Sequence, residues 1–117
     1  MIEVISTGPF ACLQDLGRLG YQQLGVSRSG AADQRSHRLA NRLVGNASDA
    51  ATIEFVLGGL DLQLTAAATV AFTGARCPGT AWQVALSCPA GSRLRLGPPA
   101  SGLRSYLAVR GGFSIAP

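Results

Sequence analysis

Short apolar segments, separated by glycine and proline at near-regular intervals, constrain the fold of this chain more than any other feature. Leucines alternate with polar residues over residues 60–65 and 93–96, as in strands with one buried face. Further strands are predicted over residues 1–6, 70–72, 81–85 and 106–109. The turns between them contain Gly58-Gly59, Gly74, Pro89-Ala90-Gly91, Gly97-Pro98-Pro99 and Gly111-Gly112. Such spacing is typical of a β-barrel or β-sandwich.

Residues 33–44 are the exception and predict one amphipathic helix. Asp33 occupies the N-cap position and Gly45 the position of a helix terminator. The apolar side, which we expect to be buried, holds Leu39, Ala40, Leu43 and Val44. The opposite side holds Arg35, His37, Arg38, Asn41 and Arg42. We interpret the three arginines as a solvated face, with a docking surface for an acidic partner as the alternative.

The size of the chain favours one core. Its 117 residues are 47% apolar, too many for a disordered chain. A chain of this length hides roughly two-thirds of its unfolded surface, which is enough for one compact unit and too little for two. We therefore expect residues 1–117 to form a single, mainly β domain.

The charged residues exclude several kinds of chemistry within this chain. The net charge of +4 comes from arginine alone, because the sequence contains no lysine. The chain itself therefore supplies no phosphate-loop lysine, no Schiff base and no Ser-Lys dyad. His37 is the single histidine, so we predict no metal site. The arginines are scattered and only 6% of residues are aromatic, so we predict no nucleic-acid partner.

The cysteines and the apolar segments indicate a cytoplasmic protein without a membrane partner. Cys12, Cys77 and Cys88 match no metal-binding spacing and are interpreted as buried thiols in a reducing compartment. Residues 1–6 lack the basic region of a signal peptide. Residues 62–73, the longest stretch without charge, glycine or proline, are too few to span a bilayer.

The segment between Gln14 and Gly30 is the candidate binding loop. It is rich in glycine and has no strong helix or strand period, and ordered loops of this length often carry function. Arg18 or Arg28 could hold a carboxylate or phosphate through two parallel hydrogen bonds. The alternative is that Asp15 and Arg18 brace the loop while the glycines serve turns.

A longer set of motifs adds a family resemblance to this interpretation. The set consists of Gln14-Asp15-Leu16-Gly17-Arg18, Gly20-Tyr21, Gly25-Val26, Ser29-Gly30-Ala31, Asp33, Ala40-Asn41-Arg42-Leu43-Val44-Gly45-Asn46, Glu54, Leu57-Gly58-Gly59, Phe72-Thr73-Gly74-Ala75 and residues 106–112. In order and spacing these motifs resemble the biotin-dependent carboxyltransferase-like family. That family includes the C subunit of bacterial 5-oxoprolinase, the second subunit of allophanate-hydrolase-type proteins, the antagonist of a sporulation-kinase inhibitor and the carboxyltransferase part of urea carboxylase. Arg28 and Arg76 depart from the family pattern.

The resemblance implies a cyclophilin-like β-barrel with one amphipathic helix, a homologous partner subunit and a small lactam or amide substrate. Its leading implication is a subunit of an ATP-dependent 5-oxoprolinase, which hydrolyses 5-oxo-L-proline to L-glutamate with ATP bound in the complex. Family members are longer, so the chain resembles an N-terminal portion, truncated relative to the family, and we expect it to be inactive alone. Two alternatives remain open: a regulatory protein that antagonises a homologous kinase-inhibitor partner, and carboxyl transfer from carboxybiotin to urea or a related amide.

The resemblance also implies which residues carry the chemistry. An unactivated lactam must be phosphorylated or polarised before water attacks it, which requires fixed positive donors. The implied catalytic residues are Arg18 and Asp15. The implied substrate-binding residues are Gly17, Gly20, Tyr21, Arg28, Ser29 and Gly30. Structural roles are expected for Asp33 as an N-cap, Asn41 as a partner of buried backbone, Glu54 as a partner of an arginine, and Trp82 and Tyr106 as core residues.

Overall fold

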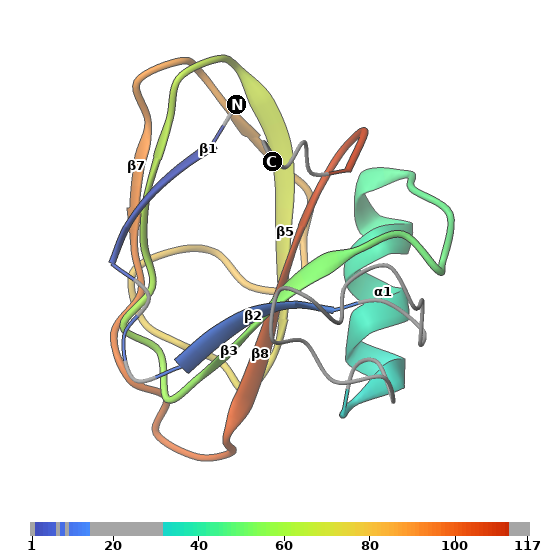
Figure 1. The fold of residues 1–117 in the computed structure, drawn as a ribbon, viewed down its shortest axis with the longest axis vertical. Coiled ribbons are helices and arrows are strands. Elements are labelled where there is room, and N and C mark those ends of the chain that lie inside the picture. Colours follow the sequence, from blue (N-terminus) through green and yellow to red (C-terminus); the bar gives the residue numbers. More distant parts are fainter. Residues whose placement is uncertain (1, 7, 9, 15–31, 113–117) are drawn as a thin grey trace.

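The computed structural model describes residues 2–6, 8, 10–14 and 32–112, whose strands form two antiparallel sheets and pack with one helix (Figure 1). The smaller sheet has the order β1-β4-β7 and consists of β1 (Ile2–Ser6), β4 (Asp61–Leu64) and β7 (Arg93–Arg95). The larger sheet has the order β2-β3-β8-β5-β6 and consists of β2 (Phe10–Gln14), β3 (Thr52–Val56), β8 (Arg104–Val109), β5 (Ala68–Gly74) and β6 (Leu86–Cys88). The helix is α1 (Gln34–Val44).

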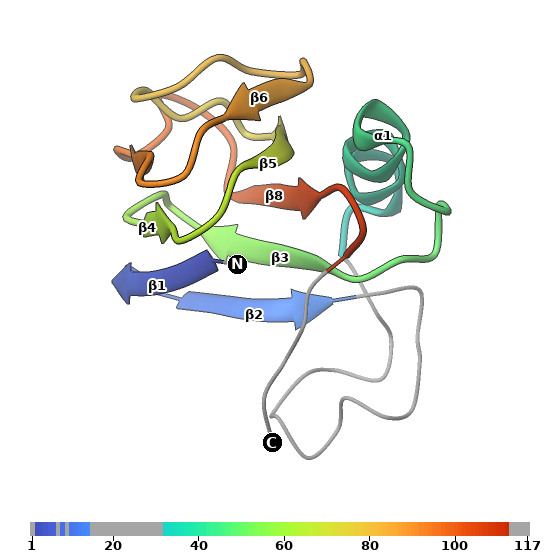
Figure 2. The same cartoon turned by 90° about the horizontal axis from the view of Figure 1, so that it is seen from above.

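Two apolar clusters, one on each face of the larger sheet, hold these layers together. Between the sheets, Phe55 and Phe72 meet edge to face and are fully buried with the β4 leucines. On the opposite face, α1 buries Ala40 and Val44 against Tyr106 and its sheet neighbours. Figure 2 shows β8 between β3 and β5, with α1 beside this sheet. Because β5 and β8 are covered on both faces, their side chains are almost continuously buried.

Most of the fold expected from the sequence is confirmed. The chain is mainly β with one helix, and the two sheets facing each other across a core are compatible with the cyclophilin-like barrel that the resemblance implied. Leucine alternation correctly identified β4 and β7. The helix begins after Asp33 and ends at Gly45, whose φ of 80° provides the left-handed cap. No helix in the described part of the chain is long and apolar enough to cross a membrane.

The strand predicted over residues 81–85 is wrong. The regular strand in this region is β6, which begins at Leu86. Gln83 has a φ of 56°, and a non-glycine residue in this left-handed region interrupts an extended chain. The side chain of Trp82 nevertheless has the expected role, since it stacks on Phe72 and its indole N–H donates to the Gly74 carbonyl at 3.1 Å.

The buried face of α1 differs from the predicted one. Leu39 and Leu43 are only partly buried, whereas His37 and Asn41, expected on the outer side, are fully buried with Ala40 and Val44. The buried stripe is therefore displaced around the helix by about one position. Arg35, Arg38 and Arg42 are exposed, as predicted.

Candidate functional site

The predicted binding loop lies outside the described residues. This applies to the implied catalytic residues Asp15 and Arg18, and to all six implied substrate-binding residues, namely Gly17, Gly20, Tyr21, Arg28, Ser29 and Gly30. The described residues on either side of this gap both adjoin β3. Gln14 pairs with Thr52 in the β2–β3 register, and the Ala32 N–H donates to Glu54 at 3.1 Å.

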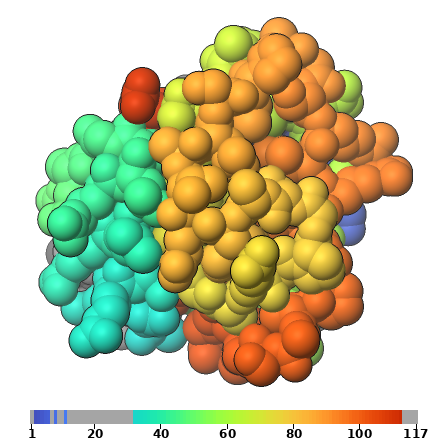
Figure 3. All heavy atoms as spheres, turned by 180° about the vertical axis from the view of Figure 1, so that it is seen from behind, coloured from blue at the N-terminus to red at the C-terminus, as the bar shows by residue number. Residues whose placement is uncertain are grey.

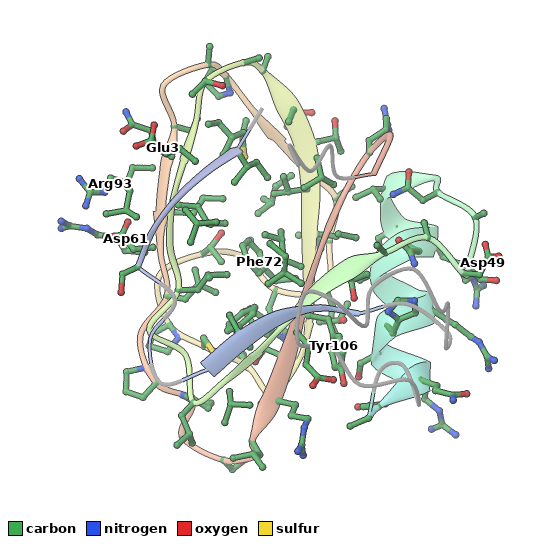
Figure 4. All side chains as sticks on the ribbon, in the orientation of Figure 1. Glu3, Asp49, Asp61, Phe72, Arg93 and Tyr106 are labelled. Carbon is green, nitrogen blue, oxygen red and sulfur yellow. The ribbon has the colours of Figure 1, made fainter. Side chains whose placement is uncertain are left out.

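A buried carboxylate on β3 is the centre of the polar contacts near this position. Glu54 is only 4% exposed, and its Oε2 accepts hydrogen bonds from the Tyr106 hydroxyl at 2.5 Å and from the Ala32 N–H. Its Oε1 lies 3.6 Å from Arg104 Nε, an ion pair that confirms the expected arginine partner. Tyr106 is fully buried between β8 and α1 (Figure 4), and its hydroxyl accepts the Asp33 N–H at 2.8 Å. The Glu54 cluster is thus Glu54, Tyr106 and Arg104, with the backbone of residues 32–33.

Tyr106 acts in this cluster as a neutral hydrogen-bond donor. Burial and the hydrogen bond to Glu54 raise the pKa of its hydroxyl far above the ordinary value, because an ionised phenol would be desolvated beside a carboxylate. The hydroxyl therefore keeps its proton at neutral pH. This arrangement links β3, β8 and the start of α1 at one point.

A second group of buried polar side chains lies on α1, one helical turn after Asp33. His37 Nδ1 is 2.8 Å from Thr52 Oγ1, and the ring of His37 meets Tyr106 edge to face. The Asn41 amide donates to the carbonyl of Ala50 at 2.8 Å, which confirms its expected role as a partner of buried backbone. These bonds allow polar side chains to occupy the interface between α1 and the sheet.

A groove of about 410 Å³ opens beside the Glu54 cluster. Its lining comprises Ala32, Asp33, Ser36, Gly74, Ala75, Gln83, Gly102, Leu103 and Arg104. Figure 3 shows the face on which the first turns of α1, the segment after β5 and the residues before β8 come together. Among the described residues of this lining, Asp33 and Arg104 carry the charged side chains.

Asp33 serves the helix rather than the groove. Its side chain accepts the Ser36 N–H at 3.1 Å and the Ser36 hydroxyl at 2.6 Å, as expected for an N-cap. The hydrogen bond from the Ser36 side chain is the main reason why the pKa of Asp33 lies below its usual range. The carboxylate is therefore already bonded within its own helix.

A larger hollow, of about 760 Å³, offers less chemistry. Small and apolar residues from β5, β6 and their surroundings make up most of its described lining, in which Arg110 is the one charged side chain. Arg110 Nε already donates to the Val44 carbonyl at 2.9 Å. Burial raises the pKa of the Cys88 thiol, which keeps it protonated. Within the described ranges no group of His, Cys, Asp and Glu side chains is arranged to hold a metal ion.

The groove residues Gln83 and Arg104 were not singled out from the sequence. Gln83 belongs to the segment 81–85 that was wrongly predicted as a strand, so its left-handed backbone conformation was not expected. Arg104 lies two residues before the predicted strand 106–109. It is one of ten arginines, and nothing in the sequence distinguishes it from the others. Only the pairing of β3 with β8, which sets Val56 opposite Arg104, brings this arginine to Glu54.

Comparison with known proteins gives related sequences and structures over nearly the whole chain. Residues 24–117 match the family described as carboxyltransferase domain, subdomain A and B. The chain is 39% identical to the 5-oxoprolinase C subunit of Escherichia coli strain K12, covering 100% of this chain and 40% of that protein. It is 37% identical to urea amidolyase of Saccharomyces cerevisiae, over 97% of this chain and 7% of that protein. The crystal structure of Kluyveromyces lactis urea carboxylase is similar with a TM-score of 0.86 and 34% identity, over 98% of this chain and 11% of that one. The chain therefore spans less than half the length of each of these proteins.

Proposed function

Because this chain belongs to the carboxyltransferase family of subdomains A and B, we propose that it is part of the C subunit of an ATP-dependent 5-oxoprolinase. The complex would open the lactam of 5-oxo-L-proline to give L-glutamate. The observation that carries this proposal is the 39% identity to the C subunit of a 5-oxoprolinase along 100% of the chain. A second such protein, from Haemophilus influenzae, is 34% identical over 98% of the chain.

The proposal assigns the chemistry to a complex rather than to this chain alone. A lactam resists water until its carbonyl oxygen is phosphorylated or strongly polarised, and the developing negative charge then needs fixed donors. Arg18 is the proposed donor in this chain, because a guanidinium binds carboxylate or phosphoryl oxygens through two parallel hydrogen bonds. Asp15 is proposed to hold that guanidinium or accept a proton.

The described residues do not fit a bound ATP. Among the described residues, the groove beside α1 offers a single guanidinium, that of Arg104, for the several negative charges of a triphosphate. In the proposal ATP is used by the assembled complex, with a partner subunit of related shape, in the cytoplasm.

The test is reconstitution. The protein is produced together with the subunits encoded by neighbouring genes, and release of L-glutamate from 5-oxo-L-proline is measured with and without ATP. The proposal expects glutamate release that needs both ATP and this protein. An assembled complex that binds its partners but releases no glutamate contradicts it, and is the outcome expected of a regulatory protein.

Substitution of Arg18 by lysine tests its proposed role within that assay. Lysine keeps the charge and loses the planar fork, so turnover is expected to fall at least tenfold, equivalent to about 1.4 kcal/mol. The thermal midpoint should change little. If Arg18 only braces the loop against Asp15, stability falls instead and activity per folded complex stays the same.

Carboxyl transfer is the second candidate, favoured by the relatives named urea amidolyase and urea carboxylase. Biotin is carried on a lysine, and this sequence has none, so another chain or segment would have to supply it. The two candidates differ in one measurement. Carboxyl transfer predicts decarboxylation of added carboxybiotin that depends on urea, whereas the 5-oxoprolinase proposal predicts no response to urea.

A further inference from the structure

We propose that the groove beside α1 binds a small ligand bearing a carboxylate, with Arg104 as the partner of that carboxylate. The identity of the ligand rests on the proposed function, whose substrate, 5-oxo-L-proline, has one carboxylate on a lactam ring. A volume of about 410 Å³ is suited to a small molecule. The groove would then distinguish lactams with a carboxylate from those without one.

Arg104 is held in a way that leaves part of its guanidinium available. Its side chain is 43% exposed and approaches Glu54 through Nε, while Glu54 is itself fixed by Tyr106 and the Ala32 N–H. Among the described residues, its two terminal amino groups donate no hydrogen bond, and Glu54 is the one ion-pair partner of Arg104. A guanidinium has five N–H donors and binds carboxylates through two of them in parallel. Glu54 therefore orients Arg104 without occupying its whole binding capacity.

Gln83 supplies a second indication, independent of charge. Its φ of 56° places a non-glycine residue in the left-handed region, and its N–H donates to the Phe72 carbonyl at 2.8 Å. Strained conformations of this kind concentrate at binding sites, because the fold must stabilise them from outside. Gln83 lines the groove, and a glutamine amide can both donate and accept, which matches the N–H and carbonyl of a lactam.

The other charge in the groove does not oppose this ligand strongly. Asp33 accepts two hydrogen bonds from Ser36, so its carboxylate is bonded towards the helix. Arg35, which adds to the lowering of the Asp33 pKa, further offsets its charge. A ligand carboxylate is therefore expected beside Arg104, with the lactam ring towards Gln83.

The experiment compares two probes that differ in one group. Binding of 5-oxo-L-proline and of 2-pyrrolidone, which lacks the carboxylate, is measured by calorimetry on the assembled complex without ATP. The wild type is expected to bind 5-oxo-L-proline at least tenfold more tightly. Arg104→Gln should remove this difference and leave 2-pyrrolidone affinity unchanged. Equal affinities in the wild type, or an unchanged difference in the variant, overturn the inference.

Arg104→Lys is a second variant that tests the same role if Arg104→Gln does not fold. It keeps a positive charge beside buried Glu54 but loses the fork, so 5-oxo-L-proline affinity should fall at least fivefold with 2-pyrrolidone again unaffected. Arg110→Gln, in the larger hollow, is the matched control and should change neither affinity. Unchanged 5-oxo-L-proline affinity in folded Arg104→Lys contradicts the inference.

Gln83 is tested by a pair of glycine substitutions. Gln83→Gly relieves the positive φ and removes the amide, so stability should rise while both probes bind more weakly. Leu57 has a nearly identical φ of 60° and does not line the groove, so Leu57→Gly should affect the backbone in the same way and leave binding unchanged. Equal binding by the two variants would remove Gln83 from the site.

The outcomes separate this inference from the proposed function. A complex that hydrolyses 5-oxo-L-proline, but whose KM is the same in Arg104→Gln, refutes the inference and leaves the function. A complex without hydrolysis that still shows carboxylate binding dependent on Arg104 refutes the function and leaves the inference.

Discussion

Replacing Tyr106 by phenylalanine removes a single buried hydroxyl that connects two strands to the helix. The hydroxyl donates to Glu54 at 2.5 Å and accepts the Asp33 N–H at 2.8 Å. A hydrogen bond to a charged group contributes about 1.5–3 kcal/mol and one between neutral groups about 1 kcal/mol. We therefore expect Tyr106→Phe to lower the free energy of unfolding by about 2.5–4 kcal/mol.

Urea unfolding followed by Trp82 fluorescence measures this loss. Trp82 is the single tryptophan and stacks on Phe72 in the core, so its emission reports on global packing. Combining Tyr106→Phe with Glu54→Gln should cost less than the sum of the two single changes, because Glu54→Gln removes the charge that strengthens the bond deleted by Tyr106→Phe. Asp61→Asn, in the exposed ion pair with Arg93 on the other sheet, is the control and should be additive with Tyr106→Phe.

The same variant has a signature at high pH. The Tyr106 pKa is raised in the folded protein, so the unfolded chain loses this proton first, near the ordinary pKa of about 10. The contribution is complete below that pH and is lost as the pH rises above it. The wild type should therefore lose stability more steeply than Tyr106→Phe above pH of about 10. Parallel curves, or a loss below about 0.5 kcal/mol at neutral pH, would refute the reasoning.

Three further predictions concern the helix and the turns. Asp33→Ala should lower the free energy of unfolding by about 1 kcal/mol, and Asp33→Asn should lower it much less, since asparagine also caps helices. Because the pKa of Asp33 is lowered on folding, the stabilisation by its carboxylate should fade as the pH drops below about 4. Urea unfolding at a series of acid pH values would show this. Gly45→Ala should lower the stability by about 1–2 kcal/mol, because at this position only the positive φ is unfavourable. Gly58→Ala should lower it far more, since its Cβ would also lie 2.2 Å from the Gly97 oxygen. Thermal melts of the two variants make this comparison. Arg38→Gln should change stability by less than about 0.5 kcal/mol in the same melts, as expected of a solvated face, and weaker binding to a partner subunit would instead support docking.

β4, which has one covered face, was predictable from the sequence, and β3 was not. In β4 every second side chain is buried, so its leucines alternate with polar residues. β3 lies between β2 and β8 and is covered on both faces, and the buried carboxylate of Glu54 interrupts its apolar run. Neither periodicity nor hydropathy identified this segment. Its partners, Tyr106 and Arg104, are about fifty residues away along the sequence.

The buried face of the helix was misassigned for a related reason. Leucine suggests burial and histidine suggests exposure when each is considered alone. In the structure, the bonds of His37 to Thr52 and of Asn41 to Ala50 offset the cost of burying them. These partners lie on β3 and just before it, so the pattern within α1 cannot reveal them. The candidate groove has the same property, because its lining comes from four separate parts of the chain.

The position of β8 also has a consequence during protein synthesis. This strand is the last one along the described chain, yet it pairs with β3 on one side and β5 on the other. Until residues 104–109 leave the ribosome, both neighbours present unpaired backbone edges, and these edges invite pairing with other chains. A nascent chain that stalls before β8 is therefore expected to depend on chaperones, whereas one that has passed it can complete the sheet at once.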